Sequence, residues 1–303
     1  MINVIRVTNY LGESIDLDLK NPEESGFAVY AMDGIGPDEA SINIKDVATY
    51  DGGKYNSARF KKRDINLTLR FVGTDIESVR QKSYKYFPTK HLLRLTFYTD
   101  NRTTYVEGYV EENEATIFAT KNNKAGCKIS IVCADPYFYS LYDNTVVFSG
   151  VMPMFEFPFD NNSTSKDLIE IGSIVTKQYE TVYYEGDADN GVIITIHTLG
   201  TVGDLSIHNV SKRQSITLYQ SKLETMTGSG LTESDTVTIN TNRGHKGITL
   251  LRDGNEINIL NCLGKSIDWF TISKGDNIFA YVASEGASNV QFKVVSKNIH
   301  EGV

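Results

Sequence analysis

The sequence predicts a mostly β protein with two domains, an N-terminal α+β domain of split-barrel or sandwich type with one helix and a β-sandwich after it. Short runs of β-branched and aromatic residues recur along the chain, and turn residues such as Asn101 and Asp253-Gly254 separate or interrupt them. One segment among these runs has a helical pattern instead. The length of 303 residues exceeds what most single hydrophobic cores hold, which favours two domains.

The predicted strands form two groups, one on each side of a polar stretch in the middle of the chain. Each run has turn residues at its ends or within it and is rich in residues that fit a pleated, half-buried surface. The first group comprises residues 3–11, 63–72, 92–99, 104–110 and 127–133, and the second comprises residues 191–199, 214–220, 236–241, 247–260 and 289–296.

The helix is predicted within residues 73–91, "GTDIESVRQKSYKYFPTKH". Thr74 fits an N-cap with Glu77 three residues later, the pattern of a capping box, and the helical pattern stops before Pro88. One stripe of this helix is suited to cover a sheet. The stripe comprises Ile76, Val79, Ser83, Tyr86 and Phe87.

Composition places a boundary between the two groups of strands. Residues 141–165 hold two of the six prolines and an Asn-rich polar stretch. We therefore predict an N-terminal domain over residues 1–140, a linker over 141–165 and a C-terminal β-sandwich domain over 166–303.

Charge and cysteine content narrow the class of protein. The net charge of −8 and the pI near 5.2 argue against binding of nucleic acid, because phosphate neutralisation needs clustered Lys and Arg. An acidic surface favours solubility, and it also suits a protein surface to which nucleic acid should not bind. Cys127, Cys133 and Cys262 have no Cys-x-x-Cys spacing, and we expect them to be reduced and buried. With no secretory signal and no long apolar run, we expect synthesis in a cytoplasm and no membrane anchor.

The patterns that carry catalysis or metal binding are weak. Glu111, Glu112 and Glu114 suggest a carboxylate pair for glycoside hydrolysis, but adjacent strand residues point to opposite faces, which favours a solvated hairpin tip. "GDADNG" at 186–191 lacks the bidentate Glu of a calcium loop, and the five histidines show no zinc-ligand spacing. "TGSGLTES" at 227–234 has no phosphate-loop Lys and indicates a flexible turn. We predict no catalytic residue, no metal site and no cofactor.

Whole segments carry more information than single residues. Residues 59–114 run from "RFKKRDINLTLRFV" through the helix to "TYVEGYVEENE", so a basic cluster, a strand, a short helix and a hairpin follow one another. "CADPYFYS" at 133–140 passes from a strand into Asp-Pro and aromatic residues. Residues 236–284 hold an Asp-Gly hairpin, a Ser-x-aromatic strand and a "KGDN" turn. Together these segments resemble the distal tail protein family (Dit) of siphophages.

The resemblance implies a structural, non-enzymatic baseplate protein at the tip of a long non-contractile phage tail, made in the host bacterial cytoplasm. Six copies would form a hexameric ring of N-terminal domains around a channel through which DNA only passes, with the galectin-like sandwich domains outside. The implied partners are further copies of the chain, the tail tube protein, a tail-associated tip protein, and receptor-binding or other baseplate proteins that serve host adsorption.

A closed ring needs two different complementary surfaces on each copy. One basic set lies just before a predicted strand and one acidic set lies at the far end of a hairpin, and opposite charges across a subunit boundary guide its register. Solvated faces of a single subunit are the alternative interpretation. The candidate subunit contacts are Arg59, Lys61, Lys62 and Arg63 on one side and Glu111, Glu112 and Glu114 on the other.

Two aromatic features leave alternatives open. The block of Pro136, Tyr137, Phe138 and Tyr139 is interpreted as the joint between the two domains, with core aromatics and a sugar platform as alternatives. The rival function is a carbohydrate-binding module that attaches to cell-surface glycans, because many sugar binders share a galectin-like sandwich. Trp269, the one tryptophan, is the candidate sugar contact, and core packing is its other interpretation.

Overall fold

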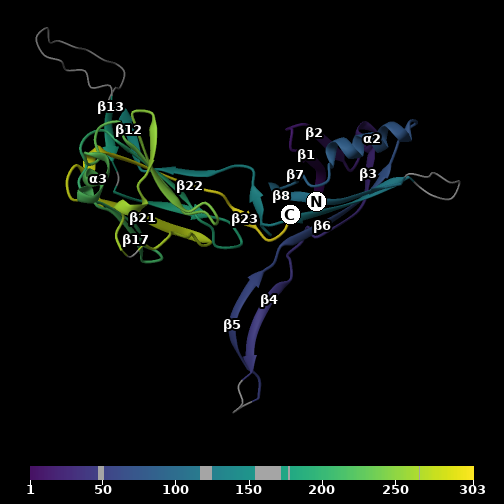
Figure 1. The fold of residues 1–303 in the computed structure, drawn as a ribbon, viewed down its shortest axis with the longest axis horizontal. Helices are drawn as coiled ribbons and strands as arrows, with labels where there is room; N and C mark the ends of the chain where they lie inside the picture. The colour runs from purple at the N-terminus through teal and green to yellow at the C-terminus, as the bar shows by residue number, and fades with distance from the viewer. Residues whose placement is uncertain (47–50, 117–124, 154–171, 177, 266) are drawn as a thin grey trace, which may run out of the picture. The chain divides into compact units, whose positions relative to one another are not determined.

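The structure is a computed structural model that describes residues 1–303 except 47–50, 117–124, 154–171, 177 and 266 (Figure 1). The chain divides into two compact units. Unit 1 comprises Met1–Leu141 together with Ile299–Val303, and unit 2 comprises Tyr142–Asn298. Strands predominate in both units, as the sequence predicts.

A nine-stranded sheet forms the centre of unit 1, in the order β2-β1-β7-β8-β9-β6-β3, with β10 beside β8 and β23 beside β10. Neighbouring strands are antiparallel, and their side chains alternate between a buried and an outer face. The bounds are β1 (Ile2–Thr8), β2 (Ser14–Asp18), β3 (Phe27–Asp33), β6 (Arg63–Phe71), β7 (Leu92–Thr99), β8 (Thr103–Ala115), β9 (Gly126–Cys133), β10 (Phe138–Ser140) and β23 (Ile299–His300).

Helix α2 (Ile76–Tyr86) packs on the core of this unit through the predicted stripe, with Val79 and Ser83 buried in the helix. Its N-terminus differs from the predicted capping box. Asp75 is the N-cap, and its side chain accepts a hydrogen bond from the Ser78 N–H at 3.1 Å, while Glu77 pairs with Arg80. Asp75 takes this role because its carboxylate sits three residues before a free N–H of the first helical turn.

Unit 1 also contains a second helix, which the sequence does not predict. The single turn α1 (Pro22–Ser25) begins with a proline and ends at Gly26, whose φ of 85° is left-handed. A Cβ at Gly26 would lie 2.8 Å from a methyl carbon of Val79, so the position also lets the chain approach α2 closely.

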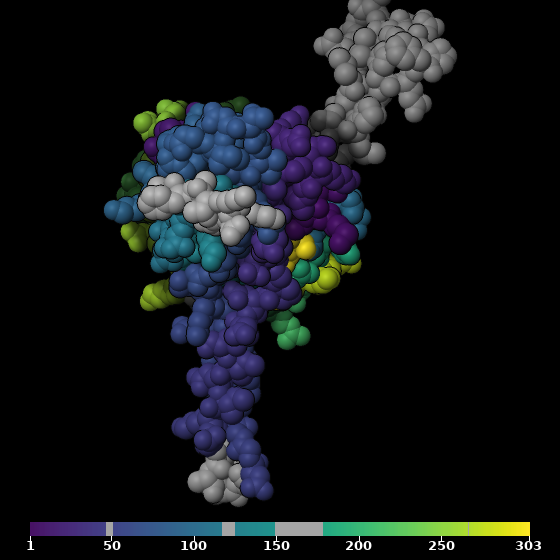
Figure 2. Space-filling model, turned by 90° about the vertical axis from the view of Figure 1, so that its right-hand side faces the viewer, coloured from purple at the N-terminus to yellow at the C-terminus, as the bar shows by residue number. Residues whose placement is uncertain are grey.

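The strands β4 (Ala40–Asp46) and β5 (Gly53–Phe60) form a separate two-stranded sheet, called the ribbon below. Within the described residues, each of these strands pairs with the other and with no third strand. Figure 2 shows the ribbon as a narrow projection of unit 1. The predicted strands do not include it, although Ile42 and Ile44 alternate with polar residues before an Asp-Gly-Gly turn, which is a hairpin signal.

Unit 2 is a β-sandwich of a six-stranded sheet, in the order β11-β22-β15-β18-β19-β20, and a four-stranded sheet, in the order β14-β21-β16-β17. Buried side chains of the two sheets meet: Tyr281 of β21 stacks on Phe292 of β22 at 5.4 Å between ring centroids. The bounds are β11 (Asn144–Val147), β14 (Tyr179–Tyr184), β15 (Ile193–Thr198), β16 (Leu205–Asn209), β17 (Gln214–Leu218), β18 (Thr236–Asn240), β19 (Gly247–Arg252), β20 (Asn255–Asn258), β21 (Gly275–Ala283) and β22 (Val290–Ser296).

Shorter elements complete unit 2 and show that it is not purely β. They are the pair β12 (Ser149–Pro153) and β13 (Gly172–Thr176), the helix α3 (Gln220–Thr227), and the 3-10 turns η1 (Leu260–Cys262) and η2 (Ala287–Asn289). No helix in the described parts of the chain is long and apolar enough to cross a membrane.

The unit boundaries differ from the predicted linker in two respects. Residues 142–153 contain β11 and β12 and belong to unit 2, while the rest of the predicted linker, residues 154–165, lies outside the described residues. The last described residues, 299–303, belong to unit 1 rather than to the sandwich. Strand pairing between segments far apart in sequence decides both points, and local composition does not report such pairing.

Candidate interaction surfaces

The ribbon presents apolar side chains that no other described part of the chain covers. Ile42, Ile44 and Tyr55 are 60%, 58% and 61% exposed, and Tyr55 lies opposite Ile44 in the strand register. A two-stranded ribbon is marginally stable in water unless something packs on it. Exposed apolar clusters on such an element are typical of a contact with another protein.

Basic side chains follow the ribbon to its end and beyond. Lys45 and Lys54 lie opposite each other, and Arg59 lies one residue before the end of β5. Lys61 and Lys62 come directly after β5, and all five of these residues are exposed. Three of the predicted subunit contacts therefore belong to one basic surface that includes the ribbon.

The acidic residues Glu111, Glu112 and Glu114 are exposed in the last part of β8, as expected for solvated side chains. They lie on the strand itself rather than at a hairpin tip. A bulge between Val110 and Glu112 interrupts the register with β9. Such a bulge turns the strand locally and changes which way its side chains point.

Lys62 lies close to the acidic run of its own subunit. The Lys62 ammonium donates to Asp64 at 2.8 Å, and this contact together with the charge of Glu111 raises the pKa of Lys62. The attraction between Lys62 and Glu111 inside one subunit therefore competes with a contact across a subunit boundary. An experiment has to separate these two arrangements.

Arg63 is not part of the exposed basic surface, which corrects its prediction as a subunit contact. The residue is 2% exposed, and its guanidinium donates to the main-chain carbonyls of Gly34, Gly36, Pro136 and Glu301 at 2.7, 2.6, 2.6 and 2.8 Å. Burial lowers its pKa from the ordinary value. The sequence carries a signal for this burial. Side chains of a strand alternate between its two faces, and Arg63 falls on the same face as the buried leucines of β6.

Two residues of the aromatic block pack inside unit 1. Phe138 is fully buried and packs edge-on against Phe97, at 5.7 Å between ring centroids. Tyr137 packs edge-on against Phe60, the last residue of β5, at 5.9 Å between centroids. The Phe138 contacts favour the core-aromatic interpretation, and the Tyr137 contact connects the block to the end of the ribbon.

Tyr139 lies at the end of the same block. Its ring stacks on Tyr105 at 5.8 Å between centroids, and its hydroxyl donates to the Asp135 carboxylate. The first segment of unit 1 ends two residues later, at Leu141. The block thus directly precedes the change of unit, and its role as a joint stays a prediction.

Trp269 is half-buried, in a segment without regular strand structure. The Lys246 ammonium lies 5.9 Å from its ring centroid. The neighbouring Phe270 is fully buried and packs edge-on against Phe279, so Phe270 is the core residue of this segment. Trp269 is thus neither fully buried nor fully exposed, and both of its interpretations, sugar contact and core packing, stay predictions.

The acidic turn at 186–191 is held by lysines of unit 2. Asp189 pairs with Lys212 at 2.7 Å, and Asp187 lies 3.8 Å from Lys274. Throughout the described residues, no group of three or more His, Cys, Asp or Glu side chains is placed to hold a metal ion.

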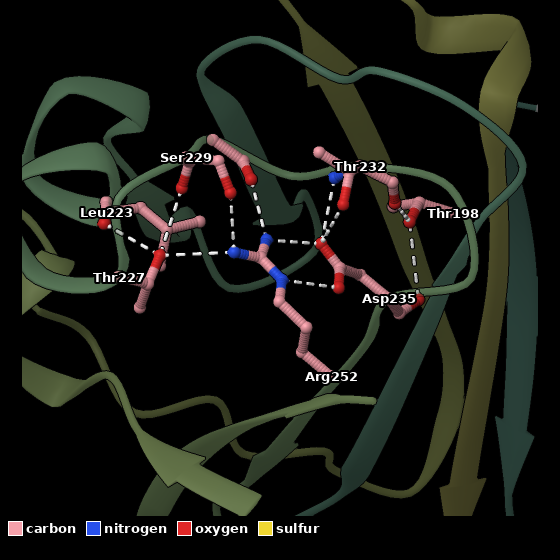
Figure 3. Close-up of polar contacts among 8 residues, drawn as sticks. Thr198, Leu223, Thr227, Ser229, Thr232, Asp235 and Arg252 are labelled. Carbon is pink, nitrogen blue, oxygen red and sulfur yellow. Dashed lines mark hydrogen bonds and ion pairs between the residues drawn. The ribbon is translucent and has the colours of Figure 1, made fainter. Parts of the chain in front are cut away.

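The segment 227–234, for which the sequence predicts a flexible turn, accepts hydrogen bonds from the arginine of a buried ion pair (Figure 3). Arg252 pairs with Asp235 through two hydrogen bonds of 2.8 and 2.5 Å, and the Asp235 side chain is 2% exposed. The remaining guanidinium hydrogens bind Thr227, Ser229 and the Gly230 carbonyl at 3.2, 2.7 and 2.6 Å. The sequence does not reveal this network, because its central arginine lies on β19, outside the segment.

Comparison with known proteins yields similarity in structure alone. No protein-family model matches the sequence, and no curated protein sequence matches it. The Dit protein of phage SPP1, described as a paradigm of the hub adsorption apparatus in phages that infect Gram-positive bacteria, is 13% identical, with a TM-score of 0.63 over 98% of this chain and 99% of that chain.

A second solved structure, a chain of the phage P2 baseplate in its activated conformation with calcium, is 14% identical, with a TM-score of 0.51 and full coverage of both chains. At such identities the likeness concerns the fold and not individual residues. The chain therefore has the fold of a phage distal tail protein, the family that its sequence resembles.

Proposed function

We propose that this chain is a structural protein of a phage tail tip, in which unit 1 of six copies forms a closed ring between the tail tube and the host-adsorption proteins of the baseplate. The fold shared with the SPP1 Dit protein supports this role, because that protein is described as a hub of an adsorption apparatus. The partners proposed are further copies of the chain, the tail tube protein, the tail-associated tip protein and other baseplate proteins. The role is structural and includes no catalytic step.

One observation carries the proposal of self-assembly, namely the uncovered ribbon with its exposed Ile42, Ile44 and Tyr55. A second copy is the proposed occupant because the charges are complementary. Residues 40–62 carry five Lys or Arg against two Asp, a net charge of +3, whereas the whole chain carries −8 and the remainder therefore −11. A basic ribbon that meets an acidic surface of the next copy is a head-to-tail contact, which closes into a ring when the rotation allows.

The acidic partner surface proposed is that of Glu111, Glu112 and Glu114. A charge exchange in trans tests it. One variant carries Lys61→Glu and Lys62→Glu, and the other carries Glu111→Lys and Glu112→Lys. Each variant alone is expected to lose the ring, measured by native mass spectrometry at low salt, because like charges then meet at every boundary. An equal mixture is expected to form rings, because every boundary of an alternating ring again pairs acid with base.

The control is a single chain with all four changes, which regains opposite charges whether they pair within or between subunits. If this chain assembles and the mixture does not, the charges pair inside one subunit and the interface lies elsewhere. A wild-type chain that stays monomeric at high concentration, alone and with the tail tube protein, contradicts the ring itself.

Trp269 supports a second candidate function, binding of cell-surface glycans by unit 2. Trp269 is half-buried, and hydrogen bonds at Thr271 hold its segment in place. The Asn209 amide donates to the Thr271 carbonyl at 2.9 Å, and the Thr271 N–H donates to the Gln214 side chain at 3.1 Å. A preorganised aromatic face with polar neighbours is what a sugar site needs. Host cell-wall polysaccharide is expected to change the fluorescence of this single tryptophan. Tyr142→Ala, at an aromatic residue that is 76% exposed, is a control that leaves this response intact, and an unchanged spectrum contradicts glycan binding at Trp269.

A further inference from the structure

Residues 299–303, called the strap below, return to unit 1 after the whole of unit 2 and lie where the ribbon begins. The first two residues form β23, which pairs with β10 at Tyr139 and Phe138. Beyond them, the Val303 N–H donates to the Ile35 carbonyl at 3.0 Å. Ile35 lies in the turn of residues 34–37 that leads into β4. This turn and Phe60, the last residue of β5, which pairs with Ala40 at the start of β4, are called the root of the ribbon.

Arg63 connects the strap to the root. Its guanidinium binds the carbonyls of Gly34 and Gly36 in the root, Pro136 at the start of the aromatic block, and Glu301 in the strap. Arg63 is buried, so water does not replace its N–H groups if the guanidinium moves away. Each carbonyl that it binds would then lack a hydrogen-bond donor, which costs free energy. One side chain therefore makes the position of the root depend on the position of the strap.

Close packing strengthens this dependence. A Cβ at Gly302 would lie 3.2 Å from backbone atoms of Gly36 and Pro37, so the strap and the root approach each other closely and a side chain there would require the root to shift slightly. Arg102 holds the strap from a second direction by donating to the Gly302 carbonyl at 2.9 Å. Phe60 completes the root through its contact with Tyr137.

We propose that the strap locks the root of the ribbon, so that the ribbon is positioned to contact a second copy only after unit 2 has been synthesised and the strap has docked. The proposal rests on the proposed function, in which the ribbon forms the contact between copies. A chain whose second unit is incomplete lacks the strap, and its ribbon lacks a fixed base. Incomplete chains are thereby kept out of the ring.

The experiment measures hydrogen exchange and ring formation of the full chain in two variants. Arg63→Lys keeps the charge but offers three donors in place of the planar guanidinium that serves four carbonyls. Val303→Pro removes the one N–H that binds Ile35 and leaves Arg63 intact. In both variants, amide exchange of the strap and the root in the monomer is expected to rise on the order of tenfold or more, and the fraction of chains in rings is expected to fall.

Two controls separate positioning of the root from general loss of stability. Glu301→Ala keeps the main-chain carbonyl that Arg63 binds, and it is expected to leave exchange and assembly unchanged. Arg70→Lys changes an arginine on the same strand, β6, that lies over the Tyr30 ring and away from the strap. If exchange rises equally across the whole sheet of unit 1, the residues stabilise the fold generally, and the strap proposal is overturned.

The remaining outcomes of the experiment also decide whether the strap proposal stands. Faster exchange of the root with unchanged ring formation means that the strap orders the root but does not control assembly, which overturns the proposal. Unchanged exchange of the root overturns it directly. A wild-type chain that never forms rings contradicts the proposed function, and the monomer exchange data then still show whether the strap orders the root.

Discussion

The guanidinium of Arg63 lies 2.8 Å from the main-chain carbonyl oxygen of Glu301, a residue 238 positions later in the chain. Unit 1 is discontinuous in sequence, and this contact joins its two segments. The buried arginine of the first segment binds an acceptor in the second segment, which follows unit 2 in the chain. Contacts over such separations form late in folding, because the loop between them has to be closed first. The most basic stretch of the sequence, residues 59–63, thus contains residues with two different roles. Its lysines are exposed, whereas Arg63 is buried and binds main-chain carbonyls.

Replacement of Ile42 and Ile44 by Ser is expected to abolish ring formation while the monomer keeps its stability within about 0.5 kcal/mol, because both side chains are exposed in the isolated chain. Light scattering and urea unfolding measure the two properties. Val282→Ser, at a 57% exposed valine of unit 2, is the matched control and is expected to change neither. Rings that persist in the Ile42 and Ile44 variant show that the ribbon is not the contact.

Cleavage at a protease site introduced between Pro153 and Gly172 is expected to leave the two fragments associated. The strands β12 and β13 pair across this site, and β11 before it pairs with β22 after it. This expectation differs from two independently folded parts, which a linker over residues 141–165 would give. Size-exclusion chromatography after cleavage should show one species in buffer and two in urea, and two species in buffer would contradict the strand pairing.

Loss of the arginine in the Arg252 and Asp235 pair is expected to destabilise unit 2 by about 3 kcal/mol, because Arg252→Met leaves a buried carboxylate without its partner. Addition of Asp235→Leu should recover part of this loss. Arg94→Met breaks an exposed pair with Glu107, at 47% and 41% side-chain exposure, and is expected to cost about 1 kcal/mol at most. Equal losses in Arg252→Met and Arg94→Met would contradict the role of burial.

The same pair predicts how the stability of unit 2 depends on acid. Burial would raise the pKa of the Asp235 carboxyl, but the bonds from Arg252 and Thr232 outweigh burial and lower it. A carboxyl with a lowered folded pKa contributes stability above its unfolded pKa of about 3.9 and loses it as pH falls further. The free energy of unfolding should therefore fall below about pH 4 in the wild type. This fall should be smaller in the variant that carries both Arg252→Met and Asp235→Leu.

The thiols of Cys127 and Cys133 are expected to resist alkylation in the native protein. Burial raises the pKa of each to about 12, so almost no reactive thiolate is present at pH 8. All three cysteines are free and buried, as the sequence predicts. Mass spectrometry after iodoacetamide should show no modification in buffer and three modified cysteines in urea, and rapid native modification would show that these strands open readily.

Sequence patterns that repeat within a few residues were sufficient for much of the fold. The parity of Ile65, Leu67 and Leu69 places one face of β6 in the core, and the stripe around Val79 places α2 on the core of unit 1. The same reasoning did not reach the helix cap, because Thr74 and Asp75 are both competent caps and the backbone geometry selects between them. It also left Trp269 between two interpretations, because neighbours on a short mixed strand do not show which of them is covered.

The sequence by itself determined the mostly β class, the helix α2, the buried reduced cysteines and the acidic balance of charge, because each depends on local period or on composition. Only the tertiary structure decided that Arg63 is buried while Lys62 is exposed, that residues 299–303 belong to unit 1, and that no other described segment covers the ribbon. Period assigns a side chain to one of two faces, but what covers that face depends on segments far away in the chain.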